Sequence, residues 1–339
     1  MNARALLSVL FHADKALDLV ATARDLGVLA QLDAGPATLR ELADMTGARP
    51  LRMYKFLDGL ESLGLITREQ PTDDLLSARY ASREPLIAAV EAVLGEGSIE
   101  RDRNAYPWRD IHGRLASVLS GQLDARFAWP PASAEEVRGF EHSMAAGTPP
   151  IIEALRGARA QVFGARDAGP RRWLDVGGGD GTVAAALLRE DPRLVCDVYN
   201  LASVEGLVRD RAAAQGLAGR LGFVAGDFLV EPLPRGYDVL SFIRVLHDWP
   251  ADVARMLLRR AADALAPGAR IVICEEFRTP DRLAVQLFWT YFLIGVDGCI
   301  SQLREAAWYV DALAALGFTE ITVLPGAPGA FEIVVAVRA

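Results

Sequence analysis

The chain has 339 residues, enough for about two domains with separate cores. Its hydrophobic content of 51% and charged content of 24% are ordinary for a globular protein, and its net charge of −8 argues against a general nucleic-acid surface. No apolar run reaches the roughly 18 residues of a membrane span, and the N-terminus lacks the pattern of a signal peptide. The three cysteines, Cys196, Cys274 and Cys299, are too few and too scattered for a disulfide framework or a zinc knuckle. A reducing cytoplasm is therefore the expected location, with no membrane partner.

Residues 1–90 are expected to form a mainly helical, winged-helix-like domain. Apolar residues follow helical spacing over Ala3–Leu29, and the helix is expected to stop at Gly27. Thr38–Glu41 has the capping-box pattern that begins a second helix. A third helix is expected over Leu51–Leu63, and the strand-like Leu65–Arg68 follows it. Helix, turn, helix and a short β wing is the order of elements in a winged helix.

A winged helix in isolation favours DNA binding, which would make the chain a DNA reader with a ligand-sensing domain. The expected recognition helix carries the basic residues Arg49, Arg52 and Lys55. It also carries Asp58 and Glu61, so its face is not consistently basic. Together with the acidic net charge, this makes nucleic acid the less favoured partner.

Residues 91–165 are expected to form a helical bridge that supplies substrate-pocket helices, and residues 166–339 a Rossmann-like α/β domain. In the second region, strands alternate with helical stretches, which predicts a mostly parallel seven-stranded sheet with helices on both faces. A short glycine-containing turn joins the last two strands, so the closing strand is expected to be antiparallel. The expected strands are Arg172–Val176, Val195–Asn200, Leu221–Ala225, Tyr237–Val245, Arg270–Phe277, Glu320–Leu324 and Phe331–Val337.

The most informative motif is W-L-D-V-G-G-G-D-G. The strand ends in Asp175, and the turn that opens the next helix contains three alternating glycines, Gly177, Gly179 and Gly181. Thr182 stands where a dinucleotide fingerprint has its third glycine, and no G-K-[ST] run of a phosphate-binding loop follows. An acidic strand end beside such a turn suits a ligand that presents an amino-acid moiety. The motif therefore favours S-adenosylmethionine over an incidental glycine turn.

The later strand ends are expected to complete this site, because ligands of open α/β sheets bind at the carboxyl ends of the strands. Asn200 would accept from ribose hydroxyls, Asp227 would accept from the adenine amino group, and Phe228 would cover the ring. The residues expected to bind the cofactor are Asp175, Gly177, Gly179, Gly181, Asn200, Leu201, Gly226, Asp227, Phe228 and Arg244.

The stretch Leu174–Glu276 resembles the small-molecule O-methyltransferases typified by plant caffeate-type and bacterial antibiotic-tailoring enzymes. The matching motifs, in the family's order, are D-V-G-G-G-D-G, N-L-A-S-V, G-D-F, H-D-W and A-P-G-A-R-I-V-I-C-E. The runs G-P-A-T-L-R-E-L-A and L-E-S-L-G-L-I resemble that family's N-terminal dimerisation domain. The resemblance covers nearly the whole chain. It implies a class I S-adenosylmethionine-dependent methyltransferase and a homodimer, with the winged-helix regions intertwined at the interface.

Two positions depart from the family's pattern. Asn200 stands where the family usually has an aspartate for the ribose, and an uncharged acceptor is expected to lower cofactor affinity. Family members often carry an E-R-T run before the last helix, whose glutamate flanks the catalytic histidine. The corresponding stretch here is C-I-S-Q-L-R, so that glutamate is replaced by Gln302 or is missing.

His247 is expected to be the general base. Of the four histidines, it alone follows a central strand on the cofactor side. Strand alternation turns only one of Glu275 and Glu276 to the site, and counting from the turn at Pro267 and Gly268 favours Glu275 as the carboxylate that orients the imidazole. Asp248 either orients the substrate or caps the next helix. The simpler alternative is a histidine that merely packs in a loop.

The acceptor cavity is expected to be lined by aromatic and sulfur side chains from two helices. Clusters of this kind are more often plain core, but in the resembled family these helices line the substrate pocket. The expected substrate-binding residues are Phe140, Met144, Trp108, Phe288, Trp289 and Phe292. A weaker hypothesis places Arg4, Phe11 and His12 in the pocket of a partner subunit.

The leading hypothesis is O-methylation of a phenolic or other aromatic hydroxyl on a bacterial secondary metabolite or its precursor, without a metal. An alternative is C-methylation next to the keto group of a 2-oxo acid, assisted by a metal. Its ligands would come from His247 and Asp248 together with His142 or Cys299, and the substrate carboxylate would pair with Arg126, Arg244 or Arg304. A further alternative binds the cofactor without transferring its methyl group. No motif encodes the acceptor, its regiochemistry or the pathway.

Overall fold

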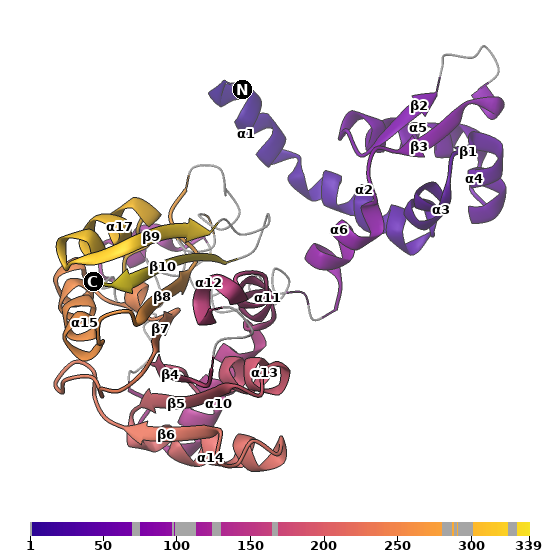
Figure 1. The fold of residues 1–339 in the computed structure, drawn as a ribbon. Coiled ribbons are helices and arrows are strands. Elements are labelled where there is room, and N and C mark those ends of the chain that lie inside the picture. The colour runs from indigo at the N-terminus through magenta and orange to yellow at the C-terminus, as the bar shows by residue number, and fades with distance from the viewer. Residues whose placement is uncertain are drawn as a thin grey trace. The chain divides into compact units, whose positions relative to one another are not determined.

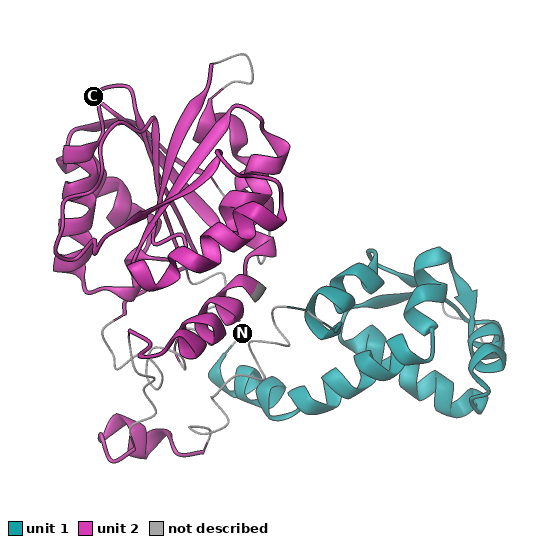
Figure 2. Cartoon of the chain, turned by 90° about the horizontal axis from the view of Figure 1, so that it is seen from below, with its two compact units in different colours: residues 1–106 teal, residues 107–339 magenta. Residues whose placement is uncertain are grey.

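The computed structural model describes residues 2–69, 75–96, 98, 113–123, 130–164, 169–279, 287, 290, 301–324 and 331–339. The predicted pocket residues Trp108, Phe288, Trp289 and Phe292 lie outside these ranges, as do Arg126 and Cys299. The chain divides into two compact units, Met1–Tyr106 and Pro107–Ala339 (Figure 2). In the described ranges, no helix is both long enough and apolar enough to cross a membrane.

The first unit consists of helices around a small antiparallel sheet with strand order β1-β3-β2. Its core is apolar, with Leu29, Leu42, Leu57 and Tyr80 fully buried. The elements are α1 (Ala3–Phe11), α2 (Ala13–Asp25), α3 (Val28–Ala34), β1 (Ala37–Thr38), α4 (Leu39–Thr46), α5 (Pro50–Ser62), β2 (Ile66–Glu69), the short 3₁₀ helix η1 (Leu75–Ser77), β3 (Arg79–Ser82) and α6 (Leu86–Leu94).

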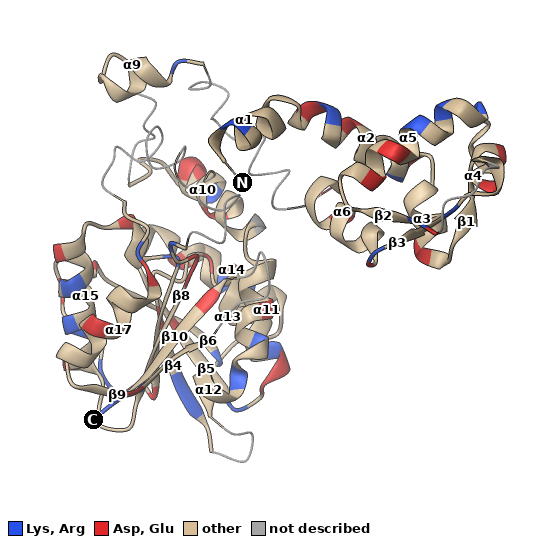
Figure 3. Ribbon diagram, turned by 90° about the horizontal axis from the view of Figure 1, so that it is seen from above, with Lys and Arg blue, Asp and Glu red and all other residues tan. Residues whose placement is uncertain are grey.

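The expected order of two helices and a β wing is present as α4, α5 and the β2–β3 pair. The predicted capping box is confirmed: the Thr38 side chain accepts from the Glu41 backbone, and the Glu41 carboxylate accepts from the Thr38 N–H at 2.7 Å. Helix α5, the expected recognition helix, carries residues of both charges (Figure 3). The winged-helix assignment itself stays a prediction.

The helix expected from Ala3 is interrupted at His12, so that α1 and α2 take its place, whereas the expected stop at Gly27 is confirmed. His12 leaves the helical region with ψ at 9°, and Gly27 has a left-handed φ of 74°. Glycine tolerates that conformation without steric cost, so Gly27 turns the chain between α2 and α3.

The second unit is built on a seven-stranded sheet with the order β6-β5-β4-β7-β8-β10-β9 (Figure 1). Strand β10 pairs antiparallel with both neighbours, and the other described pairs are parallel. This confirms the predicted mostly parallel sheet with an antiparallel closing strand. The strands are β4 (Arg171–Val176), β5 (Leu194–Asn200), β6 (Leu221–Ala225), β7 (Val239–Ile243), β8 (Arg270–Glu275), β9 (Phe318–Leu324) and β10 (Glu332–Arg338).

Helices cover both faces of this sheet: α13 and α14 lie on one face, α15 and α17 on the other (Figure 1). Successive strand residues serve opposite cores, so Trp173 packs with the first pair of helices and Leu174 with the second. The described helices of this unit are α9 (Leu115–Leu119), α10 (Ala134–Ala146), α11 (Pro149–Gly157), α12 (Arg159–Phe163), α13 (Thr182–Glu190), η2 (Ala202–Val204), α14 (Glu205–Ala214), η3 (Leu246–Asp248), α15 (Ala251–Ala264) and α17 (Ala306–Ala315).

Candidate active site

The glycine turn after β4 has the geometry that its sequence predicts. Gly177, Gly179 and Gly181 have φ values of 73°, 56° and 79°, a region that favours glycine. Added side chains would also collide, since a Cβ on Gly177 would lie 2.8 Å from Val245 and one on Gly179 2.7 Å from the Glu141 carboxylate. The turn therefore exposes bare backbone at the start of α13, where a ligand can approach closely.

Asp175 supports this turn from within the sheet. Its side chain is 1% exposed, and its carboxylate lies against Gly178. The Ser241 hydroxyl donates to Asp175 at 2.6 Å and accepts from the Trp173 indole at 2.7 Å. Burial raises the pKa of Asp175 to about 7, and the hydrogen bond from Ser241 opposes the shift.

The residues predicted for the nucleoside meet at the ends of β5 and β6. Asn200 pairs with Ala225 across the two strands, and the Gly226 N–H donates to the Asn200 carbonyl at 3.0 Å. The Asn200 side chain accepts from the Leu201 N–H at 2.8 Å. Polar acceptors and bare backbone thus occur side by side at this edge of the sheet.

Asp227 and Phe228 follow directly on the turn after β6. The Asp227 carboxylate accepts from the Leu229 N–H at 2.8 Å, which orients it locally. The Phe228 ring meets Trp249 edge to face, with centroids 5.9 Å apart. The aromatic ring predicted to cover the base is therefore anchored to the turn that follows His247.

Arg244 connects the end of β7 to α10. Its φ of 55° is unusual for a residue with a side chain. Its guanidinium donates to the Met144 carbonyl at 3.3 Å and contacts the Met144 sulfur at 3.0 Å. This contact brings α10, with Phe140 and Met144, to the carboxyl edge of the sheet.

His247 lies in η3, just after β7, and is 3% exposed. Its Nδ1 is 3.6 Å from Glu275 Oε1, and its Nε2 is 3.3 Å from Asp248 Oδ1. Burial disfavours the imidazolium and lowers the pKa of His247, and the positive charge of Arg244 also lowers it. The negative charges of Asp248 and then Glu275 outweigh both effects, so the pKa of His247 is raised. The pair of carboxylates thus makes the imidazole a stronger base.

Glu275 is the carboxylate that contacts His247, as the sequence favoured. Both Glu275 and Glu276 are 1% exposed, but Glu275 Oε1 accepts from the His247 backbone N–H at 3.1 Å. The capping role considered for Asp248 is wrong, because the N-cap of α15 is Pro250 and Asp248 belongs to η3. The half-exposed Asp248 side chain faces the imidazole instead.

Tyr309 is a further partner of Glu275 that sequence reasoning missed. Its hydroxyl donates to Glu275 Oε2 at 2.5 Å from α17. The nearby Gln302 has an exposed side chain, and its backbone N–H donates to the His247 carbonyl at 2.7 Å. Arg304 bonds the carbonyls of Leu246 and Trp249. The Gln302 backbone and the Arg304 guanidinium therefore hold the backbone of the turn that contains His247.

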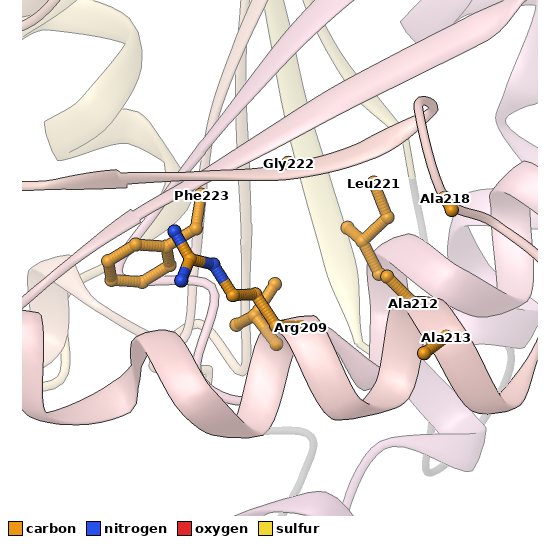
Figure 4. Close-up of a pocket in the computed structure, with 8 residues that line it drawn as sticks. Arg209, Ala212, Ala213, Ala218, Leu221, Gly222 and Phe223 are labelled. Carbon is orange, nitrogen blue, oxygen red and sulfur yellow. The ribbon is translucent and has the colours of Figure 1, made fainter.

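A cavity of about 280 Å³ lies elsewhere, between α14 and the beginning of β6 (Figure 4). It is mostly apolar and lies at the opposite end of β6 from Asp227, so it is separate from the site above. Its lining residues are Val208, Arg209, Ala212, Ala213, Ala218, Leu221, Gly222 and Phe223. No group of three or more potential metal ligands gathers within the described ranges.

Comparison with known proteins identifies the family. A sequence profile of the O-methyltransferase domain matches residues 163–318. The demethylspheroidene O-methyltransferase of Cereibacter sphaeroides is 30% identical over 330 residues, which cover 93% of this chain and 82% of that protein. The 3-hydroxy-5-methyl-1-naphthoate 3-O-methyltransferase of Streptomyces sahachiroi is 35% identical over 175 residues, half of each chain.

The fold agrees with solved structures. The S-adenosylmethionine-dependent methyltransferase SibL superposes with a TM-score of 0.69 over 98% of each chain, at 24% identity. The bare glycine turn and the acceptors at the ends of β5 and β6 fit the amino-acid and nucleoside parts of S-adenosylmethionine. The chain therefore belongs to the O-methyltransferase family and is an S-adenosylmethionine-dependent methyltransferase.

Proposed function

We propose that the enzyme methylates a phenolic or other aromatic hydroxyl of a bacterial secondary metabolite or its precursor, with His247 as general base. The observation that carries this proposal is the imidazole of His247 held between Glu275 and Asp248 at the carboxyl edge of the sheet. The name of the naphthoate relative, a 3-O-methyltransferase of a hydroxy-aromatic acid, supports the acceptor class.

When bound, S-adenosylmethionine supplies a methyl group on a sulfonium, which an oxygen nucleophile displaces in line. In this proposal, the glycine turn, Asn200 and Asp227 hold the donor, and alignment of the reactants contributes on the order of 7–11 kcal/mol. His247 takes the proton of the acceptor hydroxyl, and a general base contributes about 10²–10⁴-fold.

We assign to Nε2 of His247 the role of accepting the proton of the acceptor hydroxyl. Nδ1 faces the buried Glu275, whereas Nε2 lies beside the half-exposed Asp248. When the neutral imidazole carries its hydrogen on Nδ1, which faces Glu275, Nε2 is its acceptor atom. Glu275 then stabilises the imidazolium that forms.

The acceptor pocket is proposed to include Phe140 and Met144, which α10 brings to the carboxyl edge of the sheet. Contact between Arg244 and Met144 supports this placement. Trp108, Phe288, Trp289 and Phe292 lie outside the described ranges, and their role stays a prediction.

We also propose a homodimer formed through the N-terminal unit. Helix α1 has no buried residue, and its large apolar side chains are exposed: Leu6, Leu7, Val9, Leu10 and Phe11. Such a surface on a short helix is typical of an interface, and a second copy is the partner that the resemblance implies. Light scattering should give the dimer mass, and replacing Leu7 and Phe11 by Ser should give the monomer.

The location proposed for the protein is a reducing cytoplasm. The free, buried Cys196 and Cys274 support it.

The test of the proposed reaction is incubation with methyl-labelled S-adenosylmethionine and a panel of phenols and 2-oxo acids, with and without a chelator. Label on a phenolic oxygen, unaffected by chelation, is the expected result. Label on the carbon beside the keto group of a 2-oxo acid, lost on chelation, would contradict it and favour metal-assisted C-methylation.

A further inference from the structure

A buried carboxylate from α10 lies directly over the glycine turn. Glu141 is 5% exposed, and its Oε2 would be 2.7 Å from a Cβ placed on Gly179. The same side chain accepts a hydrogen bond from the backbone of Asp180. A capping box between Ser133 and Glu136 stabilises the first turn of α10. The carboxylate is therefore part of the surroundings of the bare backbone that receives the cofactor.

The charged residues near Glu141 do not fully stabilise its negative charge. Asp180, the next acidic residue, is itself ion-paired with Arg211 and accepts from the Thr182 hydroxyl at 2.6 Å. Arg244 is the cation that acts on Glu141, and its guanidinium is engaged with Met144. Burial, and then the charge of Asp180, raise the pKa of Glu141 to about 7, against the smaller effects of the Asp180 backbone and Arg244. A cation arriving beside it would stabilise its charged form.

We propose that the Glu141 carboxylate receives the α-ammonium group of S-adenosylmethionine. A buried carboxylate is costly unless it is paired, and the ammonium of the methionyl part supplies a charge-assisted partner at the turn. Asp175, the other acid at this turn, is less suited, because it lies within the sheet and is bonded to Ser241. Glu141 therefore selects a donor that carries an amino group.

The test is calorimetric binding of two ligands to the full-length protein. One is S-adenosylhomocysteine, and the other is its analogue with hydrogen in place of the α-amino group. For Glu141→Gln, which conserves shape, we expect affinity for S-adenosylhomocysteine to fall about tenfold and affinity for the deaminated analogue to stay within about twofold of wild type. Glu135→Gln, an exposed position on the same helix, should leave both affinities unchanged.

Equal losses for both ligands, or no loss for either, would overturn the proposal. Proton release gives a second readout. Because the free carboxyl has a pKa of about 7, binding at pH 7 should release roughly half a proton from the wild type and none from Glu141→Gln, measured in two buffers of different ionisation enthalpy. This test concerns binding alone, so its failure would leave the role of His247 untouched, and a failed role for His247 would appear only in the rate.

Discussion

The Nδ1 atom of His247 lies 3.6 Å from Oε1 of Glu275, and that carboxylate is held at both of its oxygens. Oε1 accepts from the His247 backbone N–H at 3.1 Å, and Oε2 accepts from the Tyr309 hydroxyl at 2.5 Å. Two donors from different elements leave the carboxylate little rotational freedom. It can therefore keep the imidazole in one orientation while a proton is transferred.

The pH dependence of the rate should follow the charge around His247. A general base must be neutral, so wild-type kcat/KM should rise with pH through a midpoint above the ordinary value of 6.5. Glu275→Gln and Asp248→Asn each remove a negative charge and should lower that midpoint, Asp248→Asn by more because Asp248 is the stronger of the two influences. The opposing effect of Arg244 on the pKa of His247 is present in both variants. Midpoints equal to wild type would contradict the assignment of His247 as the titrating group.

Tyr309→Phe should destabilise the protein at neutral pH. It removes a buried hydrogen bond to a carboxylate, and such bonds contribute about 1.5–3 kcal/mol. Tyr199→Phe is the matched control, because the buried Tyr199 hydroxyl has no hydrogen-bond partner among the residues that the structure describes. Its free energy of unfolding should stay within about 0.5 kcal/mol of wild type or rise. Denaturant unfolding of both variants checks this, and equal effects would contradict it.

Asn200→Asp should strengthen cofactor binding. The amide oxygen of Asn200 lies at the end of β5, where it already accepts from Leu201. A carboxylate there would offer charged acceptors to the ribose hydroxyls, and charge-assisted hydrogen bonds are roughly twice as strong as neutral ones. Calorimetric titration with S-adenosylhomocysteine should show about a three- to tenfold gain in affinity. Weaker binding would mean that the ribose does not lie at Asn200.

Asp175→Asn should stabilise the protein at high pH. A pKa of about 7 in the folded state lies above the ordinary value of 3.8, so the wild type loses stability as pH rises from about 4 to 7. The amide does not ionise, so its advantage should grow over this range by about 4 kcal/mol and then level off. Thermal melts at pH 4 and pH 8 compare the two. A gain in melting temperature that is equal at both pH values would contradict the raised pKa.

The sheet was predictable because its signals are local. Apolar strands, glycine turns and intervening helical stretches recur along the second unit, and the glycine-containing turn before the last strand indicated the antiparallel closure. His247 and Glu275 were also predictable, because strand ends in a parallel sheet meet at one edge.

The partners of these residues were not predictable from local pattern. Tyr309 and Glu141 come from helices that are distant in sequence from the residues they contact. The helical spacing of Tyr309 and Glu141 does not distinguish them from other residues of those helices. The break between α1 and α2 at His12 could not be predicted either, because the helical spacing of apolar residues continues across it. Only the packed structure shows which of these side chains reaches the site.

The most direct test of the central claim is the rate of methyl transfer by His247→Ala, measured together with its calorimetric affinity for S-adenosylhomocysteine. We expect the rate to fall at least tenfold, with cofactor affinity within about twofold of wild type. His142→Ala, at an exposed position of α10, should keep both values. An unchanged rate for His247→Ala would remove His247 as the base.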